Sequence, residues 1–228
     1  MTTPALVQVE ELRAELASGG RPLLVDVRWV LAGSDHESYL LGHLPGAVFC
    51  DLDAELAAPP GDGGRHPLPS SAQLTAMMQR LGISPDRDVV VYDGGAGGPA
   101  ARAWWCLRWV GHEAVRVLDG GYQAWVGAGG LTETCEVVPE PTEDVVVRPG
   151  AMPVVDADQV LAGGLGRLLD ARAAERFRGD VEPVDPVAGH IPGAVSCPTT
   201  AVQRPDGRYL PPDEARAALL PDGDLTGV

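Results

Sequence analysis

Long apolar runs and an excess of positive charge are both missing from this sequence of 228 residues. No apolar stretch approaches the roughly 20 residues that span a bilayer, and the amino-terminal residues lack the basic start and apolar core of a signal peptide. Acidic residues number 32 against 17 basic ones, which gives a formal net charge of −15. Nucleic acids and anionic membranes both require basic patches, so neither is expected as a partner. A cytoplasmic protein is expected, in which local arginines must bind any anionic ligand.

Cysteine is scarce and shows no functional spacing. The four cysteines, Cys50, Cys106, Cys135 and Cys197, form no C-x-x-C pair and no cluster with histidine. We therefore expect no metal, no cofactor and no dithiol redox motif. None of the four opens a glycine-rich loop, so each is expected to be a buried, unreactive thiol.

What the sequence does contain is an internal repeat. The phrase GHLPGAV at 42–48 recurs as GHIPGAV at 189–195, an offset of 147 residues. A short apolar run that ends in an acid and an arginine precedes each copy, with Asp26 and Arg28 in the first and Asp170 and Arg172 in the second. A repeat of this kind predicts two homologous halves.

The first half alternates strand and helix patterns. Apolar runs at 23–27, 88–92 and 115–118 are typical of buried parallel strands, and helical patterns occur at 9–17 and from Ser70 or Ser71 to Leu81. A glycine-rich loop opens at Asp93, and Pro99 is expected to be the first residue of the helix that follows. This alternation predicts an α/β fold with a parallel sheet flanked by helices.

The second half restarts after a segment at 131–153 that is rich in Glu, Pro and Val. We interpret that segment as an interdomain linker between a domain at 1–130 and a second at 154–228. In the second domain we expect helices near 156–161, 173–178 and 212–220, a strand at Leu168 and the beginning of another at 225–228.

The Asp-x-Arg strand ends, the GH(I/L)PGA phrases and the DGGYQAW segment at 119–125 resemble the tandem-domain rhodaneses, the thiosulfate and 3-mercaptopyruvate sulfurtransferases. The resemblance covers essentially the whole chain. It implies two rhodanese-like domains and a cysteine persulfide that passes sulfur from a small anionic donor to a thiol or cyanide acceptor.

The resemblance also implies roles for particular residues. Asp93 matches the acid that the family's inactive domain carries in place of the nucleophile, and a carboxylate cannot accept a sulfane sulfur. Arg176 matches the arginine that binds the anionic substrate, for which a planar guanidinium is suited. The alternative is a surface arginine paired with Glu175, Glu182 or Asp180.

Because they recur in both halves, three residues of the second half are expected to support the site rather than react. Asp170 and Arg172 are interpreted as a pair that fixes the strand end. His190, like His43 in the first half, is expected to bond backbone carbonyls.

Alignment of the halves places the nucleophilic cysteine just after Val228, because Asp93 follows Pro85 by eight positions and Pro221 is the counterpart of Pro85. We therefore expect the sequence to be a carboxyl-terminally truncated piece of a sulfurtransferase. Its second domain would be incomplete, and the chain as given would be inactive.

Two other functions remain open. A rhodanese-like binding or regulatory module would have no loop cysteine, and a phosphatase of similar fold would have a loop one residue longer. Tandem halves and an acid in the first loop are not the phosphatase pattern.

Overall fold

A computed structural model describes residues 3–61, 63–95 and 97–219 and divides into two compact units, residues 1–153 and 154–228. The predicted strand at 225–228 lies outside the described residues. No described helix is long and apolar enough to cross a membrane.

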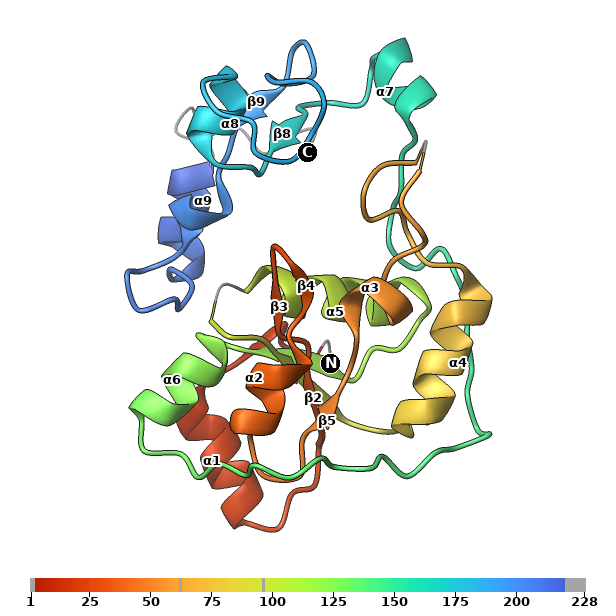
Figure 1. The fold of residues 1–228 in the computed structure, drawn as a ribbon, viewed down its shortest axis with the longest axis vertical. Coiled ribbons are helices and arrows are strands. Elements are labelled where there is room, and N and C mark those ends of the chain that lie inside the picture. The colour runs from red at the N-terminus through yellow and green to blue at the C-terminus, as the bar shows by residue number, and fades with distance from the viewer. Residues whose placement is uncertain (1–2, 62, 96, 220–228) are drawn as a thin grey trace. The chain divides into compact units, whose positions relative to one another are not determined.

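Five parallel strands form the central sheet of unit 1, in the order β1-β7-β6-β2-β5. Its elements are β1 (Leu6–Val7), α1 (Val9–Ala17), β2 (Leu23–Asp26), β3 (Trp29–Val30), β4 (Gly33–Ser34), α2 (His36–Leu41), β5 (Val48–Phe49), α3 (Leu52–Glu55), α4 (Ser71–Leu81), β6 (Val89–Tyr92), α5 (Gly98–Trp109), β7 (Val115–Leu118) and α6 (Gly121–Gly127) (Figure 1). The predicted α/β fold is confirmed.

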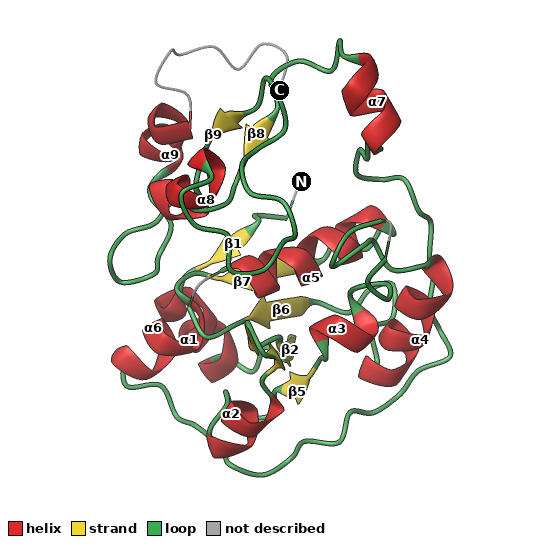
Figure 2. Ribbon diagram, turned by 45° about the horizontal axis from the view of Figure 1, so that its top comes forward, coloured by secondary structure: helices red, strands yellow, loops and turns green. Residues whose placement is uncertain are grey.

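Alternate residues of each strand face opposite sides of this sheet, and helices cover both sides, which explains why its central strands are mostly apolar. Leu23 and Val25 of β2 pack with α4 and α5, whereas Leu24 packs with α1 and α6. Figure 2 shows the sheet between these two helical layers. The first residue of α5 is Gly98 rather than the predicted Pro99, because Gly97 caps the helix one position earlier.

The segment at 131–153 contains no described helix or strand, but it belongs to unit 1 and lies against the rest of that unit. Glu133 exchanges backbone hydrogen bonds with His43, Thr142 N donates to Gln79 O, and Arg148 N donates to Val110 O. Its half-buried valines Val137, Val145 and Val147 pack against the core of unit 1.

Unit 2 contains a two-stranded parallel sheet with short helices. Its elements are α7 (Ala157–Ala162), β8 (Leu169–Asp170), α8 (Ala174–Arg178), β9 (Val195–Ser196), the 3₁₀ helix η1 (Thr199–Val202) and α9 (Pro212–Leu219). The pairing of β8 with β9 repeats that of β2 with β5, so the repeated sequence forms the same local structure twice.

Candidate functional site

The loop between β6 and α5 lies at the carboxyl end of the unit 1 sheet, where α/β proteins usually bind ligands. Asp93 is buried there, and its carboxylate accepts hydrogen bonds from the amides of Gly95 (2.8 Å), Gly97 (3.1 Å) and Ala100 (3.2 Å). Amides that converge at a helix amino terminus stabilise an anion. The anion held here is the protein's own carboxylate.

An arginine fixes the strand end in each half by the same contacts. Arg28 Nη2 donates to Asp26 Oδ2 (2.7 Å) and to Gly42 O (2.6 Å), and Arg172 Nη2 donates to Asp170 Oδ2 (2.7 Å) and to Gly189 O (2.6 Å). In both halves the arginine therefore ties the strand end to the glycine that precedes the repeated histidine.

Burial makes the two aspartates titrate differently. Desolvation raises the pKa of Asp26 above its ordinary value despite the contacts with Arg28. Asp170 is less buried, and the hydrogen bond from Arg172 lowers its pKa.

The repeated histidines also make equivalent contacts. His43 Nδ1 lies 2.9 Å from Tyr39 O, and His190 Nδ1 lies 2.7 Å from Phe177 O. A carbonyl oxygen only accepts, so Nδ1 carries the proton in both residues. Each imidazole also stacks on the ring of the residue whose carbonyl it bonds, with interplanar angles of 18° in unit 1 and 13° in unit 2.

Arg176 lies on α8 among carboxylates. Its Nη2 is 2.7 Å from Glu182 Oε1 and 2.7 Å from Asp185 Oδ2, and its Nε donates to Glu182 Oε2 at 3.2 Å. Pairing with Glu182 was the alternative interpretation of this arginine. Asp185 was not anticipated, because no sequence period links it to Arg176.

Three of the four predicted unit 2 residues line one pocket of about 450 Å³. Asp170, Arg172 and His190 lie on its wall together with Asp185, whereas Arg176 is linked to the pocket through its contact with Asp185. The structure thus brings the predicted residues into one neighbourhood, although not around one common point.

Three of the cysteines are buried, as expected, and burial raises their pKa. The pKa of Cys106 rises to about 11, while Cys50 and Cys197 follow β5 and β9 at equivalent positions. Cys135 is exposed, so the expectation that it is buried was wrong. The reason is its extended surface segment, which turns some side chains toward the core and others toward solvent.

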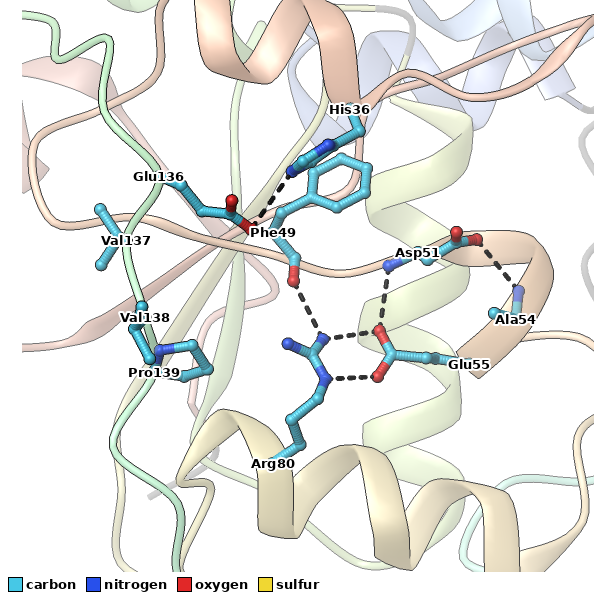
Figure 3. A pocket seen from close by; sticks show the side chains of 10 residues that line it. All are labelled: His36, Phe49, Asp51, Ala54, Glu55, Arg80, Glu136, Val137, Val138 and Pro139. Carbon is cyan, nitrogen blue, oxygen red and sulfur yellow. Dashed lines mark hydrogen bonds and ion pairs between the residues drawn. The ribbon is translucent and has the colours of Figure 1, made fainter.

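Two pockets of unit 1 were not anticipated from the sequence. One, of about 540 Å³, is shown in Figure 3, where Glu55 holds Arg80 and Glu136 lies near His36. Arg80 also donates to Phe49 O, so its guanidinium is already engaged by protein oxygens.

The second, of about 290 Å³, lies beside the first turn of α5. Its walls include Trp29, His66 and Arg102, which come from three separate segments. Among the described residues, no group of three histidine, cysteine or acidic side chains is arranged to hold a metal ion.

Comparison with known proteins gives a consistent result. Residues 8–128 match the rhodanese-like domain family. The chain is 48% identical to a provisionally named thiosulfate sulfurtransferase, SseB, of Mycobacterium tuberculosis, over 95% of this chain and 78% of that protein. It is 43% identical to a provisionally named 3-mercaptopyruvate sulfurtransferase of Pseudomonas aeruginosa, over 94% of this chain and 78% of that protein.

Solved structures agree with the sequence matches. The 3-mercaptopyruvate sulfurtransferase of Leishmania major superimposes with a TM-score of 0.82 at 29% identity, over 99% of this chain and 65% of that one. SseA of Escherichia coli, named a 3-mercaptopyruvate sulfotransferase, gives a TM-score of 0.79 at 31% identity, over 97% of this chain and 85% of that one.

Proposed function

The chain belongs to the rhodanese family, and on that premise we propose that it is part of a sulfurtransferase acting on thiosulfate or 3-mercaptopyruvate. In such a reaction a cysteine thiolate attacks the outer sulfur of thiosulfate, the S–S bond breaks, and sulfite leaves with the bonding electron pair. The persulfide then gives its sulfur to a thiol or to cyanide, and the thiolate is regenerated.

The observation that supports this assignment best is the amide cradle around Asp93. A cradle that holds a carboxylate at a helix amino terminus would equally stabilise a thiolate or the sulfur on it. In unit 1 the acid fills the cradle, and we propose that this domain is the inactive one, as its resemblance to the family implies.

In unit 2 we propose that Arg176 binds the anionic donor. Arg172 binds Asp170 and the carbonyl of Gly189, and His190 bonds the carbonyl of Phe177. These contacts support a positioning role for Asp170, Arg172 and His190.

None of the four cysteines opens a glycine-rich loop, and three are buried with raised pKa values, so we propose that the 228-residue chain does not turn over. The second candidate, a non-catalytic binding module, is favoured by the same cysteine positions.

Cyanolysis tests the proposal directly. We expect the chain to release no thiocyanate from thiosulfate and cyanide above the protein-free rate. Thiocyanate release that disappears in Cys135→Ser would contradict the proposal, because it would identify the one exposed cysteine as a nucleophile. Release that persists in Cys135→Ser would contradict it as well. Failure of the chain to bind thiosulfate at all would favour the binding-module alternative.

A further inference from the structure

The segment between the strand-end arginine and the repeated histidine differs in chemistry between the two units. It comprises residues 29–42 in unit 1 and the longer stretch 173–189 in unit 2. Only the unit 2 segment carries arginines, Arg176 and Arg178. It also carries Glu182 and Asp185, which both contact Arg176. The acidic contacts thus accompany the arginine that we propose as the donor site.

The two acids hold Arg176 in different ways. Glu182 has a side chain only 6% exposed, binds Arg176 through both oxygens, and accepts from the amides of Val184 (3.1 Å) and Asp185 (2.9 Å). These hydrogen bonds, first that from the Asp185 amide and then that from Arg176, lower the pKa of Glu182 to about 2. Glu182 therefore remains ionised and fixes the orientation of the guanidinium.

Asp185 is held less firmly. Its side chain is 38% exposed and lies on the pocket wall, and the hydrogen bond of its carboxylate to Arg176 runs from Nη2 to Oδ2 at 2.7 Å. Its Oδ2 lies 3.9 Å from Nη1 of Arg172, the other charged neighbour of Asp185. Of the two acids on Arg176, Asp185 can turn toward solvent without breaking a buried network.

Charge balance makes that movement matter for a ligand. Arg172 and Arg176 face three carboxylates, those of Asp170, Glu182 and Asp185. An anion that approaches Arg176 therefore meets no surplus positive charge while Asp185 is in place. Displacement of Asp185 leaves two arginines against two carboxylates, so the incoming anion no longer meets a net negative charge.

We propose that Asp185 is an exchangeable counter-ion that occupies the donor site of Arg176 and must be displaced by the anionic sulfur donor. This inference rests on the proposed function, since it assumes that Arg176 receives the donor. It makes Asp185 a specificity-determining residue, because its charge penalises a dianion such as thiosulfate more than a monoanion.

Calorimetric titration of the 228-residue chain with thiosulfate, at constant low ionic strength, tests the inference. We expect Asp185→Asn to bind thiosulfate on the order of fivefold more tightly, from the loss of one nearby charge in a partly exposed site. The monoanion pyruvate should gain only about twofold, because Coulomb energy scales with ligand charge. Asp185→Ser should change affinity in the same direction.

Asp180→Asn provides the matched control. Asp180 lies in the same segment but pairs with Arg178, and the substitution changes the net charge equally. We expect it to alter thiosulfate affinity less than about twofold. Equal effects of Asp185→Asn and Asp180→Asn would overturn the inference, as would a lack of thiosulfate binding by Asp185→Asn.

Arg176→Gln separates this failure from failure of the proposed function. Loss of thiosulfate binding in Arg176→Gln, together with equal effects of the two aspartate variants, would leave Arg176 as the donor site and reject only the role of Asp185. Unchanged binding in Arg176→Gln would reject Arg176 itself, and the inference with it. Circular dichroism of each variant checks that it is folded.

Discussion

At the scale of single residues, Asp93 shows how an acid replaces a reactive group without disturbing the fold. Its carboxylate supplies acceptors to three amides that would otherwise be buried without partners. The sequence predicted that this residue opens a loop and cannot accept sulfur. It did not predict that three backbone amides point at the carboxylate, because the direction of N–H groups in a glycine-rich loop leaves no pattern in the sequence.

Asp93→Ala should therefore be strongly destabilising. Removal of the carboxylate leaves buried N–H groups unsatisfied, and we expect the free energy of unfolding to fall by about 2–4 kcal/mol. Urea unfolding followed by tryptophan fluorescence measures the change. Asp86→Ala, at an exposed position before β6, should change it by less than about 0.5 kcal/mol. Equal effects of the two substitutions would show that the loop amides do not need Asp93.

The thiols should differ in reactivity according to their burial. At pH 8 we expect Ellman's reagent to label Cys135 rapidly in the native chain and to reach the other three cysteines only after denaturation.

Burial raises the pKa of Cys106 from 9.0 to about 11. The protonated thiol therefore contributes to the free energy of unfolding below pH 9, and this contribution is lost as the pH rises toward 11.

Cys135→Ser tests the assignment, since it should abolish the rapid phase of labelling. A rapid phase that survives in this variant would mean that a buried cysteine opens readily to solvent.

At the scale of elements, the apolar pattern of the sequence was sufficient to predict the central strands and the longer helices of unit 1. The run at 115–118 and the helix at 9–17 were predicted with their observed bounds, because burial on one or both faces dictates their composition. The hairpin of β3 and β4 and the helix α2 were missed. They are short and are held by local contacts such as the Asp35 cap on Ser38 rather than by a periodic apolar face.

Close approach of α6 to the loop at Asp93 explains why one position of the DGGYQAW segment requires glycine. Gly121, the first residue of α6, has φ of +56°, and a Cβ there would lie 2.5 Å from Asp93 O. We expect Gly121→Ala to lower the free energy of unfolding by more than about 2 kcal/mol, from backbone strain and displacement of the Asp93 loop.

Gly127 lies at the other end of the same helix and serves as the control. A Cβ at Gly127 would have no atom within 4 Å, so Gly127→Ala should be neutral or stabilising by up to about 1 kcal/mol. Urea unfolding distinguishes the two variants. A Gly121→Ala protein as stable as the parent would show that α6 and the loop move apart at little cost.

At the scale of the whole molecule, the two copies of the repeat differ in burial. Leu44 and Val48 are 0% and 2% exposed in unit 1, whereas their counterparts Ile191 and Val195 are 55% and 41% exposed. The repeat predicted equal local structure, and β8 with β9 provides it. Burial depends on surrounding elements that a repeated phrase does not encode, so the sequence did not predict this difference.

Unit 1 should consequently fold by itself, and the segment at 131–153 should be needed for its stability. That segment was predicted to be a linker, yet Val137, Val145 and Val147 pack on the core, and their burial contributes about 3 kcal/mol together. Since domains of this size are stable by about 5–15 kcal/mol, loss of the segment should be severe. We expect residues 1–153 to unfold cooperatively in urea, and residues 1–130 to unfold at a much lower urea concentration or to be only partly folded. Equal urea midpoints for the two fragments would mean that 131–153 is a linker after all.

Two substitutions within 1–153 refine the test, Val146→Ala at an exposed position and Val147→Ala at a half-buried one. We expect Val146→Ala to change the free energy of unfolding little and Val147→Ala to lower it by about 1 kcal/mol.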